Sequence, residues 1–415
     1  MVTRPHKVVI LSVVVVMIVL GAGIYFFSAH NQDLQEPPLG EIAAGEVDPA
    51  VWGKYYPRHY DSYQENFQDK EHPSHFETRP YMKTMYAGGG FGVEFNEPRG
   101  HVYTLEDIRN IDPARRKAGA ACNTCKSPEI PALMDQYGDK YYQMTFEEIN
   151  DKLEHPIACL DCHDPKTMDL KLTRKPLLEA LQRQGQDTGK FTRQELRSLV
   201  CAQCHVNYYY FEPGTKKIIF PWDQGLDAGQ MLKYFDDLQF VEWNHPLAGT
   251  GLLKARHPDY EMFQGSTHQT AGLACADCHM PYTRVGNVKI SSHRWTSPLN
   301  NIEQSCTVCH REGVDWLQER VQTIQSQTKQ LEDLAGQAVV EAINELAAAQ
   351  ETPGVDEKLL QEAREMHRKG QWYLDYVLVN NGGGFHNPTA SLNCLGQAID
   401  YAHRSVELAR ASRNT

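Results

Sequence analysis

Apolar residues recur every three or four positions through the C-terminal part of the chain, and this period predicts long helices. The positions that share the first stripe are Leu317, Val321, Ile324, Leu331, Leu334, Ala338 and Ile343. Pro353-Gly354 ends this helix. A second helix is expected from about Glu357 to Asn380, where Asn381 and three glycines stop it, and a third from Pro388 to about Arg410. These helices either cover a core or form the interface of a homodimer.

A second apolar pattern lies at the N-terminus. Val8 to Phe27 contains no charged side chain and follows Arg4, His6 and Lys7. A run of about 20 apolar residues can span a bilayer as a helix, whereas a cleavable signal has a shorter apolar region and small residues at the cut. Ser28-Ala29-His30 is a poor cleavage site. Residues 1–30 are therefore expected to be a retained membrane anchor, with a cleaved signal as the alternative.

The middle of the chain shows no comparable period. Residues 31–90 are polar and aromatic with frequent prolines, and they are interpreted as an extended lead-in. Residues 91–312 have long irregular connections. The expected fold is mainly α with much irregular structure, in which the region 31–312 precedes a long-helix region, 313–415.

Composition narrows the class of protein. The net charge of −12 argues against a nucleic-acid partner, because binding to phosphate backbones needs a basic surface. The hydrophobic content is 41%, with 22 prolines and 30 glycines. Such a chain is rich in loops and needs something besides its side chains to fill a core.

Cysteine motifs supply the candidate. Ten of the 11 cysteines form C-x-x-C pairs, and the remaining one, Cys394, is expected to be a small buried apolar residue. Histidine follows four of the pairs, in Cys159-Leu-Asp-Cys162-His163, Cys201-Ala-Gln-Cys204-His205, Cys275-Ala-Asp-Cys278-His279 and Cys306-Thr-Val-Cys309-His310. Lysine follows the fifth, in Cys122-Asn-Thr-Cys125-Lys126.

These motifs predict covalently bound haem c. Paired C-x-x-C motifs also bind zinc, and a single one can be a redox dithiol. Neither use needs a histidine after the second cysteine, and histidine is only 18 of 415 residues. C-x-x-C-H is the attachment signature of haem c, with the imidazole as an iron ligand. Haem c is matured outside the bacterial cytoplasm, so the chain is expected to be extracytoplasmic.

An electron-transfer haem needs a second axial ligand. The candidates are His101, His268, His293 and His386, although spacing alone does not select them from the other histidines. Lys126 is a different kind of ligand. A haem with an exchanged proximal ligand is a candidate for an open distal face, which catalysis on a small molecule requires.

Four C-x-x-C-H motifs with one C-x-x-C-K resemble the pentahaem cytochrome c nitrite reductases, which reduce nitrite to ammonium. The resemblance covers most of residues 75–410. It includes Cys204-His205-Val206, Phe220-Pro221-Trp222-Asp223, Leu253-Lys254-Ala255 with His257-Pro258, and Cys278-His279-Met280-Pro281. It implies a multihaem cytochrome c fold with a haem-packed core, five haems c and a homodimer formed through the long helices.

The resemblance also implies roles for single residues. Lys126 would be the proximal ligand of the catalytic haem, and His101, His268, His293 and His386 the distal ligands of the relay haems. Tyr208 and His257 would lie in the pocket with an arginine, for which Arg115 is favoured over Arg116 and Arg109. In the implied six-electron reaction, nitrite binds reduced iron through nitrogen, while His257 and Arg115 supply positive charge and hydrogen bonds to its oxygens.

Many members of this family bind calcium beside the pocket. The corresponding positions are Asn207, Tyr208, Lys254 and Arg256. Calcium prefers several oxygen ligands, including carboxylates. Here the carboxylate is missing and a guanidinium replaces a carbonyl donor, so Arg256 is expected to stand in for the metal; the alternative is a weaker calcium site.

Other functions stay open. One alternative is a non-catalytic multihaem electron-transfer cytochrome, and another is a related reductase that acts mainly on hydroxylamine or sulfite. The resemblance implies a multihaem quinol dehydrogenase or a soluble cytochrome c as the electron donor.

Overall fold

The computed structural model describes residues 17, 18, 20, 21, 41–211 and 216–414. The predicted membrane anchor, residues 1–30, therefore lies almost wholly outside the described residues. Within the described part of the chain, no helix is both long and apolar enough to cross a membrane.

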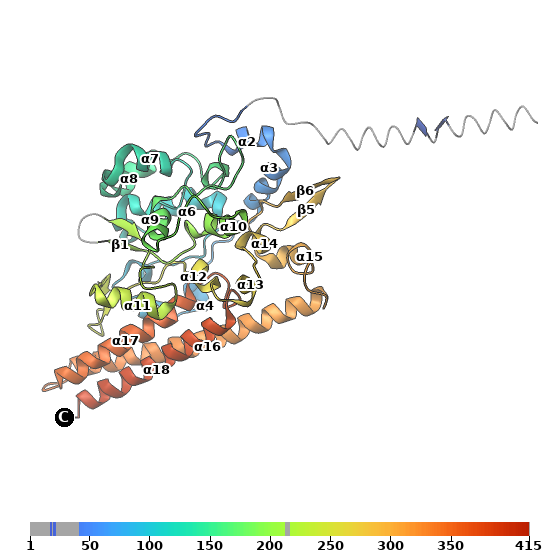
Figure 1. Cartoon of the computed structure of the whole chain (residues 1–415). Helices are drawn as coiled ribbons and strands as arrows, with labels where there is room; N and C mark the ends of the chain where they lie inside the picture. Colours follow the sequence, from blue (N-terminus) through green and yellow to red (C-terminus); the bar gives the residue numbers. More distant parts are fainter. Residues whose placement is uncertain (1–16, 19, 22–40, 212–215, 415) are drawn as a thin grey trace, which may run out of the picture.

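Three long helices pack side by side along one edge of the molecule (Figure 1). They are α16 (Val314–Gln350), α17 (Glu357–Leu378) and α18 (Pro388–Ser412), so the predicted mainly helical fold with long C-terminal helices is confirmed. Asp356 caps α17 by accepting backbone N–H groups, and Asn387 caps α18. A Cβ on Gly370 would lie 3.1 Å from the backbone nitrogen of Ala402, so the glycine permits close approach of α17 and α18.

One residue of the predicted apolar stripe of α16 does not face the core of the single chain. Leu334 is exposed, whereas Glu332 is buried. The carboxylate of Glu332 forms an ion pair with Arg79, at 2.9 Å, from a distant segment. A buried carboxylate is tolerated when it is paired in this way, and a helical period cannot reveal the distant partner.

The interpretation of residues 31–90 as an extended lead-in is also wrong for its described part. Short helices occupy much of it: α2 (Pro49–Tyr55), α3 (Pro57–Gln64), η1 (Glu65–Gln68), α4 (His75–Thr78), α5 (Met82–Met85) and η2 (Gly90–Gly92). Pro49 and Pro57 are the first residues of their helices. Proline is favourable at that position because the first helical N–H has no partner within the helix.

Short helices and hairpins connect the cysteine motifs. The helices are η3 (His101–Tyr103), α6 (Thr104–Arg109), η4 (Pro113–Asn123), α7 (Ile130–Tyr137), η5 (Gly138–Gln143), α8 (Phe146–Asn150), η6 (Cys159–Asp161), α9 (Lys175–Arg183), α10 (Arg193–Ala202), α11 (Ala228–Asp237), α12 (Asp259–Phe263), α13 (Thr267–Thr270), α14 (Cys275–His279), η7 (Pro298–Asn301) and α15 (Ile302–Ser305). Three antiparallel pairs of strands complete the described chain: β1 (Tyr209–Phe211) with β2 (Lys217–Ile219), β3 (Trp243–Asn244) with β4 (Gly251–Leu252), and β5 (Tyr282–Val285) with β6 (Val288–Ser291).

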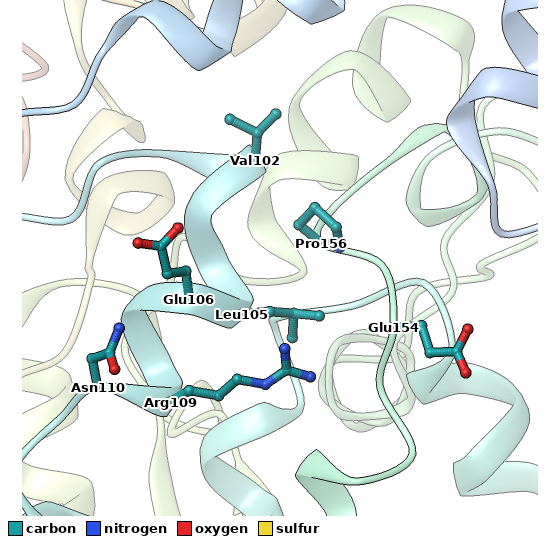
Figure 2. Close-up of a pocket in the computed structure, with 7 residues that line it drawn as sticks. All are labelled: Val102, Leu105, Glu106, Arg109, Asn110, Glu154 and Pro156. Carbon is teal, nitrogen blue, oxygen red and sulfur yellow. The ribbon is translucent and has the colours of Figure 1, made fainter.

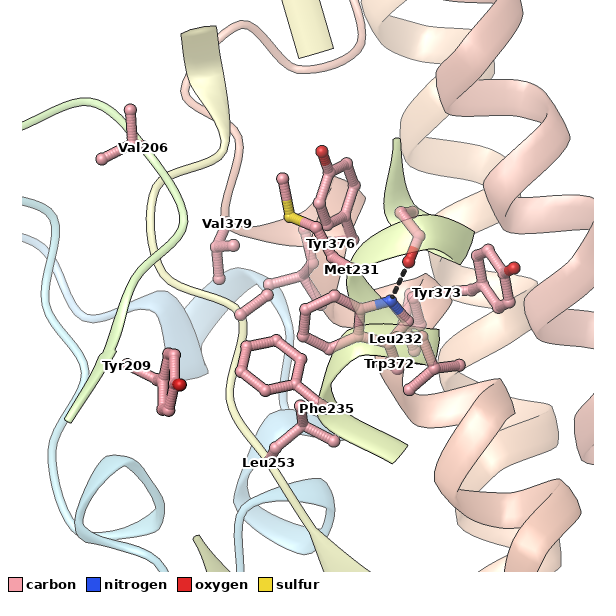
Figure 3. Packing of buried hydrophobic residues seen from close by; sticks show 14 of the residues in the cluster. Val206, Tyr209, Met231, Leu232, Phe235, Leu253, Trp372, Tyr373, Tyr376 and Val379 are labelled. Carbon is pink, nitrogen blue, oxygen red and sulfur yellow. Dashed lines mark hydrogen bonds between the residues drawn. The ribbon is translucent and has the colours of Figure 1, made fainter. Parts of the chain in front are cut away.

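A buried cluster joins α17 to the segments that lead to the cysteine motifs (Figure 3). The indole of Trp372 donates a hydrogen bond to the carbonyl of Ala228 at 2.8 Å, and its ring lies against Phe235 of α11. Phe235 in turn packs edge-on against Tyr209, which directly follows Tyr208. The long helices therefore support the backbone around Tyr208.

Candidate functional site

Each histidine of a C-x-x-C-H motif faces a second histidine from a distant part of the chain. The distances between ring centres are 5.9 Å for His205 and His101, 6.1 Å for His163 and His293, 6.2 Å for His279 and His386, and 6.3 Å for His310 and His268. The ring centres of two imidazoles bound on opposite sides of one iron would be roughly 6 Å apart, because each metal–nitrogen bond is about 2 Å long and each ring centre lies beyond its bound nitrogen. The four pairs thus fit the axial positions of four haems c.

Hydrogen bonds orient three of the four motif histidines. The Nδ1–H group of His163 donates to the carbonyl of Met168 at 2.9 Å, and that of His279 donates to the carbonyl of Thr296 at 3.1 Å. The partner of His205 is instead a carboxylate, Asp259, at 3.1 Å. A hydrogen bond at Nδ1 leaves Nε2 free to bind a metal and fixes the direction of the ring.

Arg174 holds the backbone on both sides of Lys126. Its Nε donates to the carbonyl of Thr124 at 2.8 Å, and its Nη2 donates to the carbonyl of Ser127 at 2.9 Å. The guanidinium is buried and forms an ion pair with Asp161, a residue of the second cysteine motif in the chain. The lysine motif and its neighbour are therefore fixed relative to each other.

The segment that carries Tyr208 runs beside the segment that carries His257. The N–H group of His257 donates to the carbonyl of Val206 at 3.3 Å, and that of Tyr260 donates to the carbonyl of His205 at 3.0 Å. The structure thus brings together two candidate pocket residues that are far apart in the sequence.

His257 is a neutral imidazole in this environment. Burial lowers its pKa to about 3, and the carboxylate of Asp259 opposes this shift. Near pH 7, His257 can donate or accept a hydrogen bond, but it does not carry the positive charge that the family resemblance implied for it. The arginines carry this charge instead.

Arg115 shares its surroundings with Arg256 and Tyr208. The Arg115 guanidinium lies 4.4 Å from the ring centre of Phe91, and that of Arg256 lies 5.2 Å from the same ring and 5.8 Å from the ring of Tyr208. Burial lowers the pKa of Arg115; Glu94, at 3.7 Å, opposes this shift and Arg256 adds to it. Arg115 and Arg256 therefore both lie against Phe91, and Arg256 also lies beside Tyr208.

The other two candidate arginines have different surroundings. Arg109 donates to the carbonyl of Leu153 at 2.6 Å and lines an open pocket with Glu106 and Glu154 (Figure 2). Arg116 donates to the carbonyl of Arg109 at 2.9 Å and lies over the ring of Phe146. The two side chains are thus engaged with backbone carbonyls and, for Arg116, with Phe146.

The positions that correspond to a calcium site are filled by an internal network. The side-chain oxygen of Asn207 accepts a hydrogen bond from the backbone N–H of Arg256 at 2.9 Å. The guanidinium of Arg256 is buried and forms an ion pair with Glu242. Glu242 also accepts the backbone N–H of Lys254 at 3.1 Å. Sequence reasoning missed Glu242, which lies outside every motif.

Asp375 of α17 holds the segment before His257. Its carboxylate accepts hydrogen bonds from Lys254 Nζ at 2.7 Å, from the N–H of Ala255 at 2.8 Å and from the hydroxyl of Tyr86. Burial lowers the pKa of Lys254 to about 8, and Asp375 opposes this shift. Sequence reasoning missed Asp375, although a single carboxylate in the otherwise apolar run 372–379 was a usable signal.

Glu261 is a buried carboxyl group near Asn207. One of its oxygens accepts the N–H of Asn207 at 2.8 Å and the indole N–H of Trp222 at 2.8 Å. Burial raises the pKa of Glu261 to about 8, while these hydrogen bonds oppose the shift. Glu261 therefore keeps its proton at pH values where an exposed glutamate has lost it.

This proton makes stability depend on pH. Between about pH 4.3 and 8 the folded protein binds a proton at Glu261 that the unfolded chain does not, so this group lowers the free energy of unfolding as pH rises. Glu261→Gln should remove this decrease, which is on the order of 3–5 kcal/mol. Denaturant unfolding at pH 5 and pH 8 tests it, with the exposed Glu351→Gln as control. An unchanged pH dependence in Glu261→Gln would contradict the assignment.

Four histidine pairs at C-x-x-C-H motifs, with a fifth C-x-x-C pair beside Tyr208 and His257, define a multihaem c-type cytochrome. The chain belongs to the cytochrome c552 family, whose model matches residues 48–414. It is 38% identical to cytochrome c-552 of Bacteroides fragilis over 378 residues, which cover 87% of this chain and 76% of that protein. It is 37% identical to the cytochrome c nitrite reductase subunit NrfA of Nitratidesulfovibrio vulgaris over 416 residues, with 89% and 79% covered.

A solved structure agrees with these relatives. The cytochrome c nitrite reductase catalytic subunit of Desulfovibrio desulfuricans superposes with a TM-score of 0.85 at 35% identity, covering 90% of this chain and 88% of the other. Its description names two calcium sites in that subunit. The expected multihaem cytochrome fold is thereby confirmed.

Proposed function

We propose that this protein reduces nitrite to ammonium at a haem c ligated by Lys126, supplied with electrons by four haems c that each have two histidine ligands. The observation that carries the proposal is the contrast between the motifs. Four motif histidines face a second histidine. The lysine motif instead contacts, through Cys125 and the carbonyl of Gln203, the segment that carries Tyr208 and runs beside His257. The relatives named as nitrite reductases support the same reaction.

The donor set fits five haems c. A haem supplies an iron that binds a small ligand and exchanges electrons with it. The protein residues supply the rest of the site. Arg115 and Arg256 provide fixed positive charge in a buried environment, where electrostatic interactions are stronger than in water. Neutral His257 can donate a hydrogen bond to a nitrite oxygen, and the hydroxyl of Tyr208 can donate or accept one.

The product formed from nitrite tests the proposed reaction. Purified holoprotein is supplied with a reduced dye and nitrogen-15 nitrite, and labelled ammonium is quantified against the dye oxidised. The expected result is ammonium as the main product, with six electrons used for each nitrite. Dye oxidation that depends on hydroxylamine or sulfite but not on nitrite would favour a related reductase. Failure to oxidise the dye with any of the three would favour an electron-transfer cytochrome.

Arg256 takes the place of calcium in this proposal. The Arg256–Glu242 ion pair and the hydrogen bond from the backbone of Arg256 to Asn207 support it, because the amide oxygen that would face a metal already accepts a hydrogen bond. Removing divalent cations with a chelator should leave nitrite turnover unchanged. Elemental analysis of the purified protein should find no stoichiometric calcium. A tightly held calcium, or loss of turnover that added calcium restores, would contradict the replacement.

The apolar N-terminal run, the family relationship and the exposed surface of α16 support the remaining partners. The protein functions outside the cytoplasm, tethered by its N-terminal segment, and receives electrons from a multihaem quinol dehydrogenase or a soluble cytochrome c. A homodimer through the long helices would cover Leu334 and Trp316 of α16, which are exposed in the single chain. Sedimentation of the purified protein distinguishes the dimer from a monomer.

A further inference from the structure

Asp259 is a buried carboxylate between two histidine pairs. It follows His257-Pro258 at the start of α12. One of its oxygens accepts the Nδ1–H of His205 at 3.1 Å and the side-chain N–H of Asn381 at 2.8 Å, and the other accepts the backbone N–H of Asn381 at 2.9 Å. Nδ1 of His386 lies 3.6 Å away and is hydrogen-bonded to Asn380 at 3.2 Å instead.

No other motif histidine of the described chain has such a partner. The Nδ1 groups of His163 and His279 donate to neutral backbone carbonyls. The nearest carboxylate to Nδ1 of His310 is Glu312, which is half-exposed and 3.8 Å away, beyond a hydrogen bond. His205 is thus distinguished by a direct hydrogen bond to a buried anion.

The ligand opposite His205 does not offset this effect. Nδ1 of His101 is buried and has no hydrogen-bond partner among the described residues. A hydrogen bond to a carboxylate makes an imidazole a stronger electron donor to its metal than a bond to a carbonyl does. More electron density and a nearby negative charge both favour the oxidised iron, and they therefore lower its reduction potential.

The His205 motif is also the neighbour of the lysine motif. The sulfur of Cys125 lies 3.8 Å from the carbonyl oxygen of Gln203, which stands between Cys201 and Cys204. An electron leaving the His205 site therefore has the Lys126 site as an immediate neighbour.

We propose that Asp259 is a positioning residue that sets the reduction potential of the haem held by His205 and His101 below the potentials of the relay haems whose histidines donate to carbonyls. A low potential at this point favours transfer of electrons to the neighbouring Lys126 site. The destination of the electrons rests on the proposed function, whereas the effect on the potential does not.

Asp259→Asn tests this in the holoprotein, without nitrite. The amide keeps the size of the side chain and removes its charge. In a redox titration followed by electron paramagnetic resonance, the midpoint potential of one low-spin haem should rise by about 59 mV. For one electron this corresponds to about a tenfold change in its electron-transfer equilibrium with the other haems. The control is Glu312→Gln, which removes a carboxylate near His310 that is not hydrogen-bonded and should move no midpoint.

A second variant gives the opposite sign. Asn381→Ala removes the side-chain donor that competes with His205 for the same oxygen of Asp259, so the midpoint of the same haem should fall. Asn381 is exposed, and its replacement should not prevent folding. Unchanged midpoints in both variants, or an equal shift of every haem, would overturn the role of Asp259. If the midpoint potential shifts as expected in the variants but the wild-type holoprotein makes no ammonium from nitrite, the proposed function is wrong and the role of Asp259 is unaffected.

Discussion

Replacing Arg115 with alanine is expected to lower kcat for nitrite about 100- to 1000-fold, which is the usual effect of removing one fixed donor from the site of developing charge. Arg115 and Arg256 both lie against Phe91, and Arg256 lies beside the ring of Tyr208. Burial lowers the pKa of His257 to about 3, although Asp259 opposes this shift, so His257 is neutral near pH 7 and the arginines carry the positive charge of the pocket.

The matched control is Arg116→Ala. Arg116 is the adjacent residue, but its guanidinium donates to backbone carbonyls and lies over Phe146. Its replacement should leave kcat within about twofold, since surface substitutions away from a site usually have small effects. Steady-state rates of ammonium formation compare the two variants after haem content has been matched. Equal rates for wild type and Arg115→Ala, or a larger loss in Arg116→Ala, would contradict the assignment of Arg115.

Asp375→Asn is expected to lower the free energy of unfolding by about 3–5 kcal/mol, because it leaves the buried ammonium group of Lys254 without its counter-charge. Lys254 also lies 4.7 Å from the ring centre of Tyr86 and 5.1 Å from that of Phe95. These rings attract a cation but cannot replace a carboxylate. The amide of asparagine can still accept one hydrogen bond, so the charge is the main loss.

Denaturant unfolding followed by circular dichroism measures the effect. The control is Asp237→Asn, which breaks an exposed ion pair with Lys233, 2.7 Å apart, on α11. Exposed ion pairs contribute little to stability, so this variant should unfold at the same denaturant concentration as wild type. If Asp375→Asn behaved like Asp237→Asn, the buried pair would not be what holds the segment before His257.

Local patterns predicted the regular part of the fold. The long helices α16 to α18 follow from an apolar period of three to four residues and from clear stop signals. The short helices α2 and α3 were missed because the frequent prolines of residues 31–90 were interpreted as indicating an extended chain, whereas Pro49 and Pro57 each begin a helix. Glu332 was missed as a buried residue because Arg79, its partner, lies more than two hundred residues away in the sequence.

The candidate site, like the fold, was only partly predictable from the sequence. Lys126 and the motif histidines were recognisable because the chemistry of haem attachment is contained in five consecutive residues. Asp259 and Asp375 carry no local signature. Their roles come from contacts with His205 and Lys254, which are 54 and 121 residues away along the chain. Only the folded structure brings such groups together.

The central claim is that Lys126 marks the one haem that is open to substrate. Electron paramagnetic resonance of the oxidised holoprotein, before and after addition of nitrite, tests this claim most directly. The account predicts one high-spin haem whose signal changes with nitrite, beside four low-spin haems whose signals do not. A spectrum with only low-spin haems, unaltered by nitrite, would contradict it.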